Sequence, residues 1–434
     1  MSAAMEPAGA CLQGDFDPSL RGSSLYLNVS WTLAGNVVYA ASQWLLLVTL
    51  AKMGQPEQVG QLALGLAITG PLFIASQFHL RGVQATDARG EFSFSEYLGL
   101  RSFGTVAAAL VTVLLTVALG YEAGLAAVVI FVGFARSFDN LSDIYYGALQ
   151  QQEQMARMGK SMMLKGILSV CALAFAMALT RNVVSVAMAL MTVSALTFFL
   201  YDRRSVAFGR PGRVGVTVGK FRWNLPGCWL LLKTAFPLTI VMVLVSLNLN
   251  IPRYFVERYR GTHDLGVFAA LSYLIVAGNL VVNAFGQAIA PKLARLYANG
   301  SRRGFWRIVF VLLAIAGACG LIGTAVVGLA GERLVGIVYN ASYTPYTSLL
   351  MGLMAAATLL YAGEFLGYAM TAARIFRPQA PLFLLAAGST TAACGVLIPR
   401  DGLRGAVTAM SIGFAVQALG GAAILFRDWL RHRT

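Results

Sequence analysis

Long apolar stretches, separated by short polar segments, recur along the whole chain. A membrane-spanning helix needs about 20 mostly apolar residues, because the hydrocarbon core of a bilayer is about 30 Å thick. The pattern predicts about twelve such helices. They are expected at residues 25–52, 57–80, 102–119, 123–149, 163–180, 183–201, 229–251, 265–290, 306–330, 345–373, 381–399 and 404–426. The pattern therefore indicates an all-α integral membrane protein.

The composition excludes the main soluble classes. Of the 434 residues, 58% are hydrophobic and 12% are charged, whereas a soluble domain carries roughly 25% charged residues. The chain has five Cys, an odd number, which does not fit a secreted disulfide scaffold. Four of them lie in or beside apolar runs, as small core residues do: Cys171, Cys228, Cys319 and Cys394.

The basic residues are distributed unevenly between the two sides of the predicted membrane. About 23 of the 33 Lys and Arg fall in alternate segments of the chain. These segments are 1–24, 81–101, 150–165, 202–227, 291–307, 374–380 and the tail from residue 427. By the positive-inside rule, both termini are cytoplasmic. The net charge of +15 then follows from topology. Inner loops this basic are expected to contact anionic lipids, and no nucleic-acid partner is needed.

The longest of these basic segments divides the predicted helices into six and six. We expect a cytoplasmic N-terminal segment at 1–24, an N-lobe at 25–201, a linker at 202–228, a C-lobe at 229–427 and a cytoplasmic tail at 428–434. Two weak patterns recur in both halves: a Gln before a basic residue (Gln77 with Arg81, Gln287 with Lys292) and a carboxylate before a Tyr/Gly pair (Asp143, Glu364). Internal repeats of this kind indicate two lobes that rock around a central site.

The fourth predicted span carries a polar stripe. Arg136, Asp139, Asn140 and Asp143 recur at spacings of three and four, which places them on one helical face. An ionisable group at bilayer depth costs at least about 2.5–3.5 kcal/mol, so this face should line a water-filled cavity. We expect Arg136 near mid-depth and paired with Asp139, which leaves Asp143 less compensated. An internal salt bridge that only fixes helix packing is the alternative.

Other buried polar groups are more isolated. Glu364 is either a proton-titrating group or the partner of an arginine on a neighbouring helix. Lys233 either contacts substrate or extends to the headgroups. Several amides suit sugar hydroxyls and equally suit interhelical hydrogen bonds; we count Asn36, Gln43, Asn283 and Gln287 among the candidate substrate ligands.

Catalytic and metal-binding patterns are missing from the sequence. The three His, at positions 79, 263 and 432, lie far apart, and no Cys/His pair has metal-ligand spacing. No phosphate-binding loop or nucleophile motif is complete. We therefore expect no metal, no cofactor and no enzymatic activity.

Several sequence runs resemble those of Wzx-type polysaccharide flippases, which belong to the multidrug/oligosaccharidyl-lipid/polysaccharide exporter (MOP) superfamily. The resemblance extends from about residue 25 to 300 and weakens afterwards. It is carried by Asp143–Gly147, by the run from Leu80-Arg81 to Thr86-Asp87, by Pro252-Arg253-Tyr254, by Leu265–Phe268, by Ser272-Tyr273-Leu274 and by Pro291–Ala294.

This resemblance implies a V-shaped, MATE-like bundle of two six-helix lobes in the bacterial cytoplasmic (inner) membrane. Such proteins turn oligosaccharides linked to undecaprenyl diphosphate from the inner to the outer leaflet, for surface polysaccharide synthesis. A proton or sodium gradient is expected to drive them, and a polysaccharide polymerase is a further partner to consider.

The residues can be given roles within this scheme. Arg136, with Asn140, would hold the diphosphate through bidentate hydrogen bonds. Arg81 and Lys292 would collect the headgroup at the inner boundary. The carboxylates of Asp139, Asp143 and Glu364 would serve coupling or gating.

Three other functions remain open. An exporter of drugs or organic cations would need a net acidic, aromatic cavity. A flippase for the peptidoglycan precursor would use the same chemistry, but such proteins tend to have more than twelve spans. A polysaccharide polymerase or ligase would need a larger external loop than this sequence offers.

Overall fold

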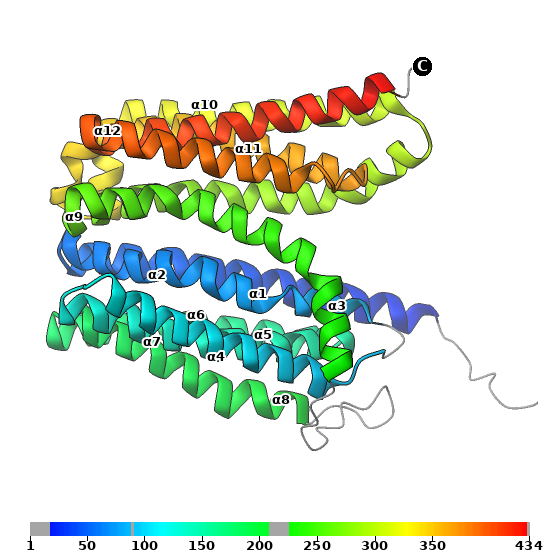
Figure 1. Ribbon diagram of the computed structural model, residues 1–434, viewed down its shortest axis with the longest axis horizontal. Coiled ribbons are helices and arrows are strands. Elements are labelled where there is room, and N and C mark those ends of the chain that lie inside the picture. Colours follow the sequence, from blue (N-terminus) through cyan, green and yellow to red (C-terminus); the bar gives the residue numbers. More distant parts are fainter. Residues whose placement is uncertain (1–17, 88–90, 208–224, 432–434) are drawn as a thin grey trace, which may run out of the picture.

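The computed structural model describes residues 18–87, 91–207 and 225–431, and these are almost entirely helical (Figure 1). The elements are α1 (Pro18–Met53), α2 (Pro56–Gln77), α3 (Leu80–Thr86), α4 (Phe94–Ala118), α5 (Ala123–Gln151), α6 (Met155–Thr180), α7 (Val183–Thr197), the π-helix η1 (Phe198–Asp202), α8 (Arg203–Ala207), α9 (Leu225–Ala298), α10 (Arg302–Val338), the 3₁₀-helix η2 (Ala341–Tyr346), α11 (Thr347–Ala372) and α12 (Gln379–Arg431). Most of the expected N-terminal segment and linker, and the last three residues of the tail, lie outside the described residues.

Two of the helices double back on themselves. Ten helices in the described ranges are long and apolar enough to span a membrane. Among them, α9 and α12 each consist of two helices joined at a glycine, Gly261 (φ 83°) and Gly402 (φ 59°), and each reverses direction there (Figure 1). Glycine adopts such positive φ values without a steric cost. The predicted spans 229–251 and 265–290 are thus the two arms of α9, and 381–399 and 404–426 are those of α12.

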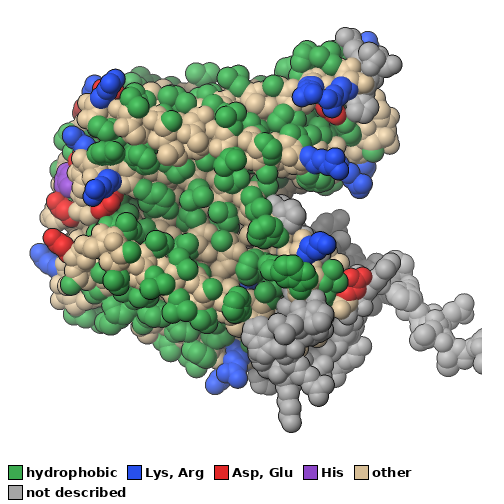
Figure 2. Space-filling view, in the orientation of Figure 1, with side chains coloured by type: hydrophobic (Ala, Val, Ile, Leu, Met, Phe, Trp, Pro, Cys, Tyr) green, Lys and Arg blue, Asp and Glu red, His purple; other side chains and the backbone are tan. Residues whose placement is uncertain are grey.

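The surface is that of a membrane protein. In the view of Figure 2, charged side chains gather at the two ends of the molecule, and hydrophobic side chains cover the surface between them. On α4, for example, Phe103, Leu110, Leu114 and Val117 are all more than half exposed. An exposed apolar surface of this extent is tolerated in lipid and avoided in water.

Helices α1–α8 form one half of the molecule and α9–α12 form the other, with α2 against α9 as the main contact between them (Figure 1). This contact is closest near the turn of α9. A Cβ on Gly60 would lie 1.9 Å from the carbonyl oxygen of Thr262, and one on Gly266 would lie 1.8 Å from that of Pro56. At the opposite end, where the C-terminus lies, the molecule is hollowed between the halves (Figure 2). The halves are therefore sealed at one end only.

At the C-terminal end, the last turns of α9 and α12 are tied together. The hydroxyl of Tyr297 donates a hydrogen bond to the carboxylate of Asp428 over 2.6 Å. Partial burial, together with this carboxylate, raises the pKa of Tyr297 to about 12. The phenol therefore keeps the proton that it donates to Asp428 throughout the physiological pH range.

The close contact between α2 and α9 leads to a prediction about stability. Replacing Gly266 with Ala should force α2 and α9 apart, and we expect a loss of about 1–3 kcal/mol in stability, the usual range for overpacking. Thermal unfolding of the detergent-purified protein measures the effect. Gly317→Ala is the matched control, because a Cβ there meets nothing within 4 Å. An equal melting temperature for both variants would contradict the tight contact.

Candidate functional site

A break in the second helix positions the first functional arginine. Helix α2 ends at Gln77, and the next two residues, Phe78 and His79, have left-handed conformations (φ 46° and 47°). This conformation costs roughly 1–2 kcal/mol for a residue other than glycine. The chain then starts α3 in a new direction, which brings Arg81 against the polar stripe of α5. The span predicted at 57–80 corresponds to α2, which ends three residues earlier, at Gln77.

A second arginine enters the same network from α4. The Ser93 side chain accepts a hydrogen bond from the Glu96 amide, while the Glu96 carboxylate accepts one from the Ser93 amide over 2.7 Å. This capping box fixes the start of the helix. Arg101 therefore lies about two turns inside α4, with 0% of its side chain exposed.

Asp143 is the centre of the network. One of its carboxylate oxygens accepts from Arg81 over 2.9 Å, and the other accepts from Arg101 over 3.0 Å. Arg101 also donates to the side-chain oxygen of Asn140 over 2.7 Å, and the amide nitrogen of Asn140 donates to Ser76 over 2.9 Å. The expectation that Asp143 would be poorly compensated was therefore wrong, because two guanidinium groups share it.

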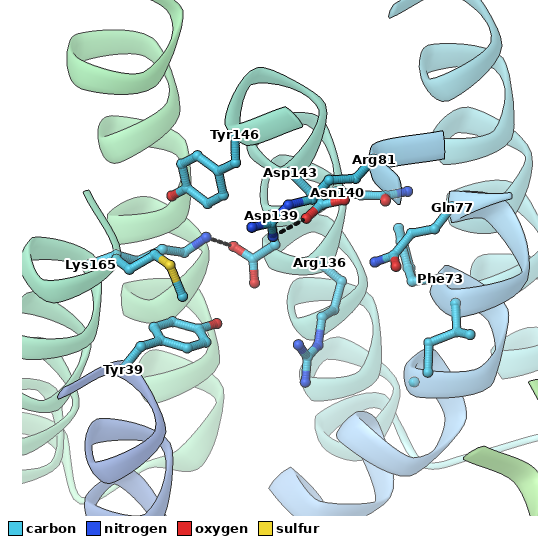
Figure 3. A pocket seen from close by; sticks show the side chains of 13 residues that line it. Tyr39, Phe73, Gln77, Arg81, Arg136, Asp139, Asn140, Asp143, Tyr146 and Lys165 are labelled. Atoms are coloured by element: carbon cyan, nitrogen blue, oxygen red, sulfur yellow. Dashed lines mark hydrogen bonds and ion pairs between the residues drawn. The ribbon is translucent and has the colours of Figure 1, made fainter. Parts of the chain in front are cut away.

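The second carboxylate of the stripe also has a partner from another helix. Asp139 forms an ion pair with Lys165 of α6, and Lys165 is 5% exposed. The predicted pair of Arg136 with Asp139 is absent. Figure 3 shows why: Asp139 points toward Lys165, while Arg136 points away from both, into the open space.

These helices enclose a cavity of about 260 Å³ in the N-terminal half. It is lined by Tyr39, Gly70, Phe73, Ile74, Gln77, Arg81, Arg136, Asp139, Asn140, Asp143, Tyr146, Met162 and Lys165 (Figure 3). With Arg101 behind the wall, four cationic side chains face two carboxylates, an excess of two positive charges. Within the described part of the chain, Arg136 has no hydrogen-bond or ion-pair partner, so it is the cation left free for a ligand.

The cavity borders the other half of the molecule. A Cβ on Gly70, which lines it, would lie 3.8 Å from the side chains of both Asn250 and Ser246 on α9. The side chains that point into this cavity therefore lie next to the contact across which the two halves would move.

The remaining predicted site residues lie elsewhere. None of them lines this cavity. On α1, Asn36 is exposed and Gln43 is partly buried; on α9, Lys233, Gln287 and Lys292 are exposed and Asn283 is partly buried; on α11, Glu364 is partly buried. Asn283 accepts a hydrogen bond from Tyr368 over 2.9 Å, which is the interhelical alternative foreseen for such amides. Glu364 has no ion-pair partner in the ranges that the structure describes.

Sequence reasoning missed Arg101 and Lys165. Arg101 was assigned to the inner loop 81–101, because the third helix was expected to begin at 102, and Lys165 was counted in the inner segment 150–165, at the very start of a span expected at 163–180. The helices begin earlier, at Phe94 and Met155. For Arg101 a signal was present: Ser93 followed by Glu96 is a capping-box pattern ahead of an apolar run.

The chain is similar in sequence to polysaccharide biosynthesis proteins and in fold to membrane transporters. A family model described as "Polysaccharide biosynthesis protein" matches residues 25–297. The capsular polysaccharide biosynthesis protein CapF of Staphylococcus aureus is 25% identical over 389 residues, which cover 89% of this chain and 95% of that protein. An inward-facing MATE family multidrug resistance transporter of the MOP superfamily superposes with a TM-score of 0.74 at 14% identity, covering 93% of this chain and 98% of the other. The lipid II flippase MurJ, in its inward closed conformation, gives a TM-score of 0.67 at 14% identity, with coverage of 93% and 89%. The expected all-helical, MATE-like membrane fold is confirmed.

The network around Asp143 can be tested by stability. We expect Asp143→Asn to destabilise the purified protein by about 3–5 kcal/mol, because it leaves the buried guanidinium of Arg101 without a counter-charge. Asp264→Asn is the matched control: Asp264 pairs with Arg260, which is half exposed, and a pair of this kind contributes less than about 1 kcal/mol. If both variants unfold at the same temperature, Asp143 does not hold the network together.

Proposed function

The chain belongs to the polysaccharide biosynthesis protein family, and on this premise we propose that it is a flippase for lipid-linked oligosaccharides. It would move repeat units linked to undecaprenyl diphosphate from the inner to the outer leaflet of the bacterial cytoplasmic membrane, for surface polysaccharide synthesis. The observation that carries the proposal is the excess of positive charge in the cavity, where Arg136 has no ion-pair partner among the residues that the structure describes.

The diphosphate is the part of such a cargo that most needs a protein ligand. It carries negative charge and must leave water to cross the membrane, which is costly unless a cation accompanies it. A guanidinium binds phosphate oxygens in a bidentate manner. Arg136 lies near the middle of α5, at the depth where a cation lowers the cost of burying the diphosphate most.

The size of the cavity fits the headgroup of the cargo. At about 260 Å³, it is smaller than the 300–1,000 Å³ of pockets that enclose drug-sized ligands. It therefore suits the diphosphate and the sugar next to it, for which the side chains of Tyr39 and Gln77 offer hydrogen bonds (Figure 3). The rest of the oligosaccharide would occupy the space between the halves.

The geometry changes the proposed roles of several residues. Arg81 is held by Asp143 and would support the cavity wall, so that Lys292, which is exposed, remains the candidate collector at the membrane boundary. Asp139 is bound to Lys165 and Asp143 to two arginines, so they would act through these ion pairs. Glu364 remains a candidate for coupling to a proton or sodium ion.

The charge of the cavity argues against the export of organic cations. A cationic drug would be repelled by an excess of two positive charges in a low-dielectric site. The likeness to a MATE transporter concerns the fold, and one fold can serve many functions.

Arg136 gives the direct test. Arg136→Ala should lower surface polysaccharide and leave completed lipid-linked units on the cytoplasmic face. We expect at least about a tenfold loss of transport, the equivalent of one charge-assisted hydrogen bond. Arg136→Lys should retain part of the activity, because a point charge remains without the bidentate geometry.

Arg333→Ala, at an exposed position on α10, controls for the loss of an arginine as such. Variants are compared at equal protein level in the membrane. Unchanged surface polysaccharide in Arg136→Ala would exclude the diphosphate role, and an altered drug resistance instead would favour the exporter.

A further inference from the structure

A second polar cluster lies behind the wall of the cavity, at the junction of α5, α6 and η1. Its centre is Asp202, which is 1% exposed. One oxygen of its carboxylate accepts a hydrogen bond from Ser161, whose hydroxyl also shares a 2.8 Å hydrogen bond with Tyr146. The other oxygen faces the hydroxyl group of Ser142, but neither of these two atoms makes a hydrogen bond of good geometry among the described residues.

A buried carboxylate is costly unless a cation or a proton neutralises it. No cation contacts Asp202 within the described ranges. Lys165 faces it from one turn beyond Ser161 on α6, but its ammonium group is paired with Asp139. Lys165 therefore stands between two carboxylates, one lining the cavity and one buried behind it.

The other charged and titratable groups around Asp202 are already engaged or point elsewhere. Arg157 of α6 donates to the carbonyl oxygen of Ser205 over 2.7 Å, and Arg203 and Arg204 of α8 are exposed. The phenols of Tyr39 on α1 and Tyr146 on α5 are neutral at physiological pH, and Asp143 is neutralised by its two arginines.

We propose that Asp202 is a proton-binding site whose occupancy controls Arg136 through Lys165, a mechanism that rests on the proposed function of Arg136. With the proton on its free oxygen, Asp202 donates to Ser142 and is neutral. Lys165 then pairs with Asp139 alone, as the structure shows, and Arg136 is free to hold the diphosphate.

Loss of the proton to solvent reverses these pairings. The charged carboxylate of Asp202 draws Lys165 away from Asp139. Asp139 then takes the nearest free cation, Arg136, which is three residues earlier on the same face of α5 and within reach. Arg136 is withdrawn from the cargo. Proton binding at Asp202 and cargo binding at Arg136 therefore favour each other, and linkage makes this effect reciprocal.

The site suits a proton better than a metal ion. Among the residues that the structure describes, only two oxygens of the cluster lack a hydrogen bond of good geometry, whereas metal ions that prefer oxygen ligands take about six or more. No group of three or more His, Cys, Asp or Glu in the described ranges has the geometry to hold a metal ion.

The test measures cargo affinity against pH for the full-length protein in lipid nanodiscs. The probe is undecaprenyl diphosphate carrying one hexose, whose two phosphates keep the same charge throughout the range. We expect the affinity of the wild-type protein to fall about tenfold from about pH 6 to about pH 9. Asp202→Asn, a neutral mimic of the protonated acid, should keep the tight affinity at every pH. Asp401→Asn, at an exposed carboxylate, should behave as the wild type.

A second variant keeps the inference testable if Asp202→Asn does not fold. Asp139→Asn removes the acceptor that would withdraw Arg136, so its affinity should also be independent of pH. A wild-type pH profile in both variants would overturn the inference and leave the proposed function intact. The inference would also be overturned, with the proposed function intact, if exchanging potassium for sodium at fixed pH changed the affinity of the wild-type protein for the probe. Failure of the wild-type protein to bind the probe at any pH would contradict the proposed function itself.

Discussion

The neutralisation of charges at membrane depth is the constraint on which the rest of this structure depends. Asp143 satisfies it by binding Arg81 and Arg101 at once, and these residues come from three different helices. An unpaired charge in this environment would cost several kcal/mol. The ion pairs therefore fix how α3, α4 and α5 pack, and they also decide which charges remain available to a ligand.

The charge that these ion pairs do not neutralise makes the cavity electropositive. Asp139 is paired with Lys165 and Asp143 with two arginines. Among the described residues, Arg136 therefore has no counter-charge, and the cavity wall keeps an excess of positive charge. Its place beside α9 connects the site to the contact between the halves. That contact is sealed near Gly60 and Gly266 and open at the other end (Figure 2), so a bound headgroup would lie where rocking of the halves changes access.

The sequence predicted the helices and the polar stripe, because both are local. Apolar length sets each span, and spacings of three and four place Arg136 and Asp143 on one face of α5. The ion-pair partners could not be predicted in the same way. Arg81 and Arg101 lie 62 and 42 positions from Asp143 in the sequence, and only packing brings them together.

Local reasoning failed where tertiary contacts outweighed it. The pair of Arg136 with Asp139 is the choice that an isolated helix would make, but α6 offers Lys165 instead. The helix break at Phe78 and His79 has only a weak sequence signal: His is enriched among residues with left-handed conformations, but Phe is not. The surrounding packing enforces it.

A structure of the protein with a lipid-linked diphosphate sugar bound would test the central claim most directly. The account predicts the diphosphate within hydrogen-bonding distance of the Arg136 guanidinium, with Asp143 still shared by its two arginines. A headgroup bound outside the N-terminal cavity, with Arg136 making no contact to it, would contradict the account.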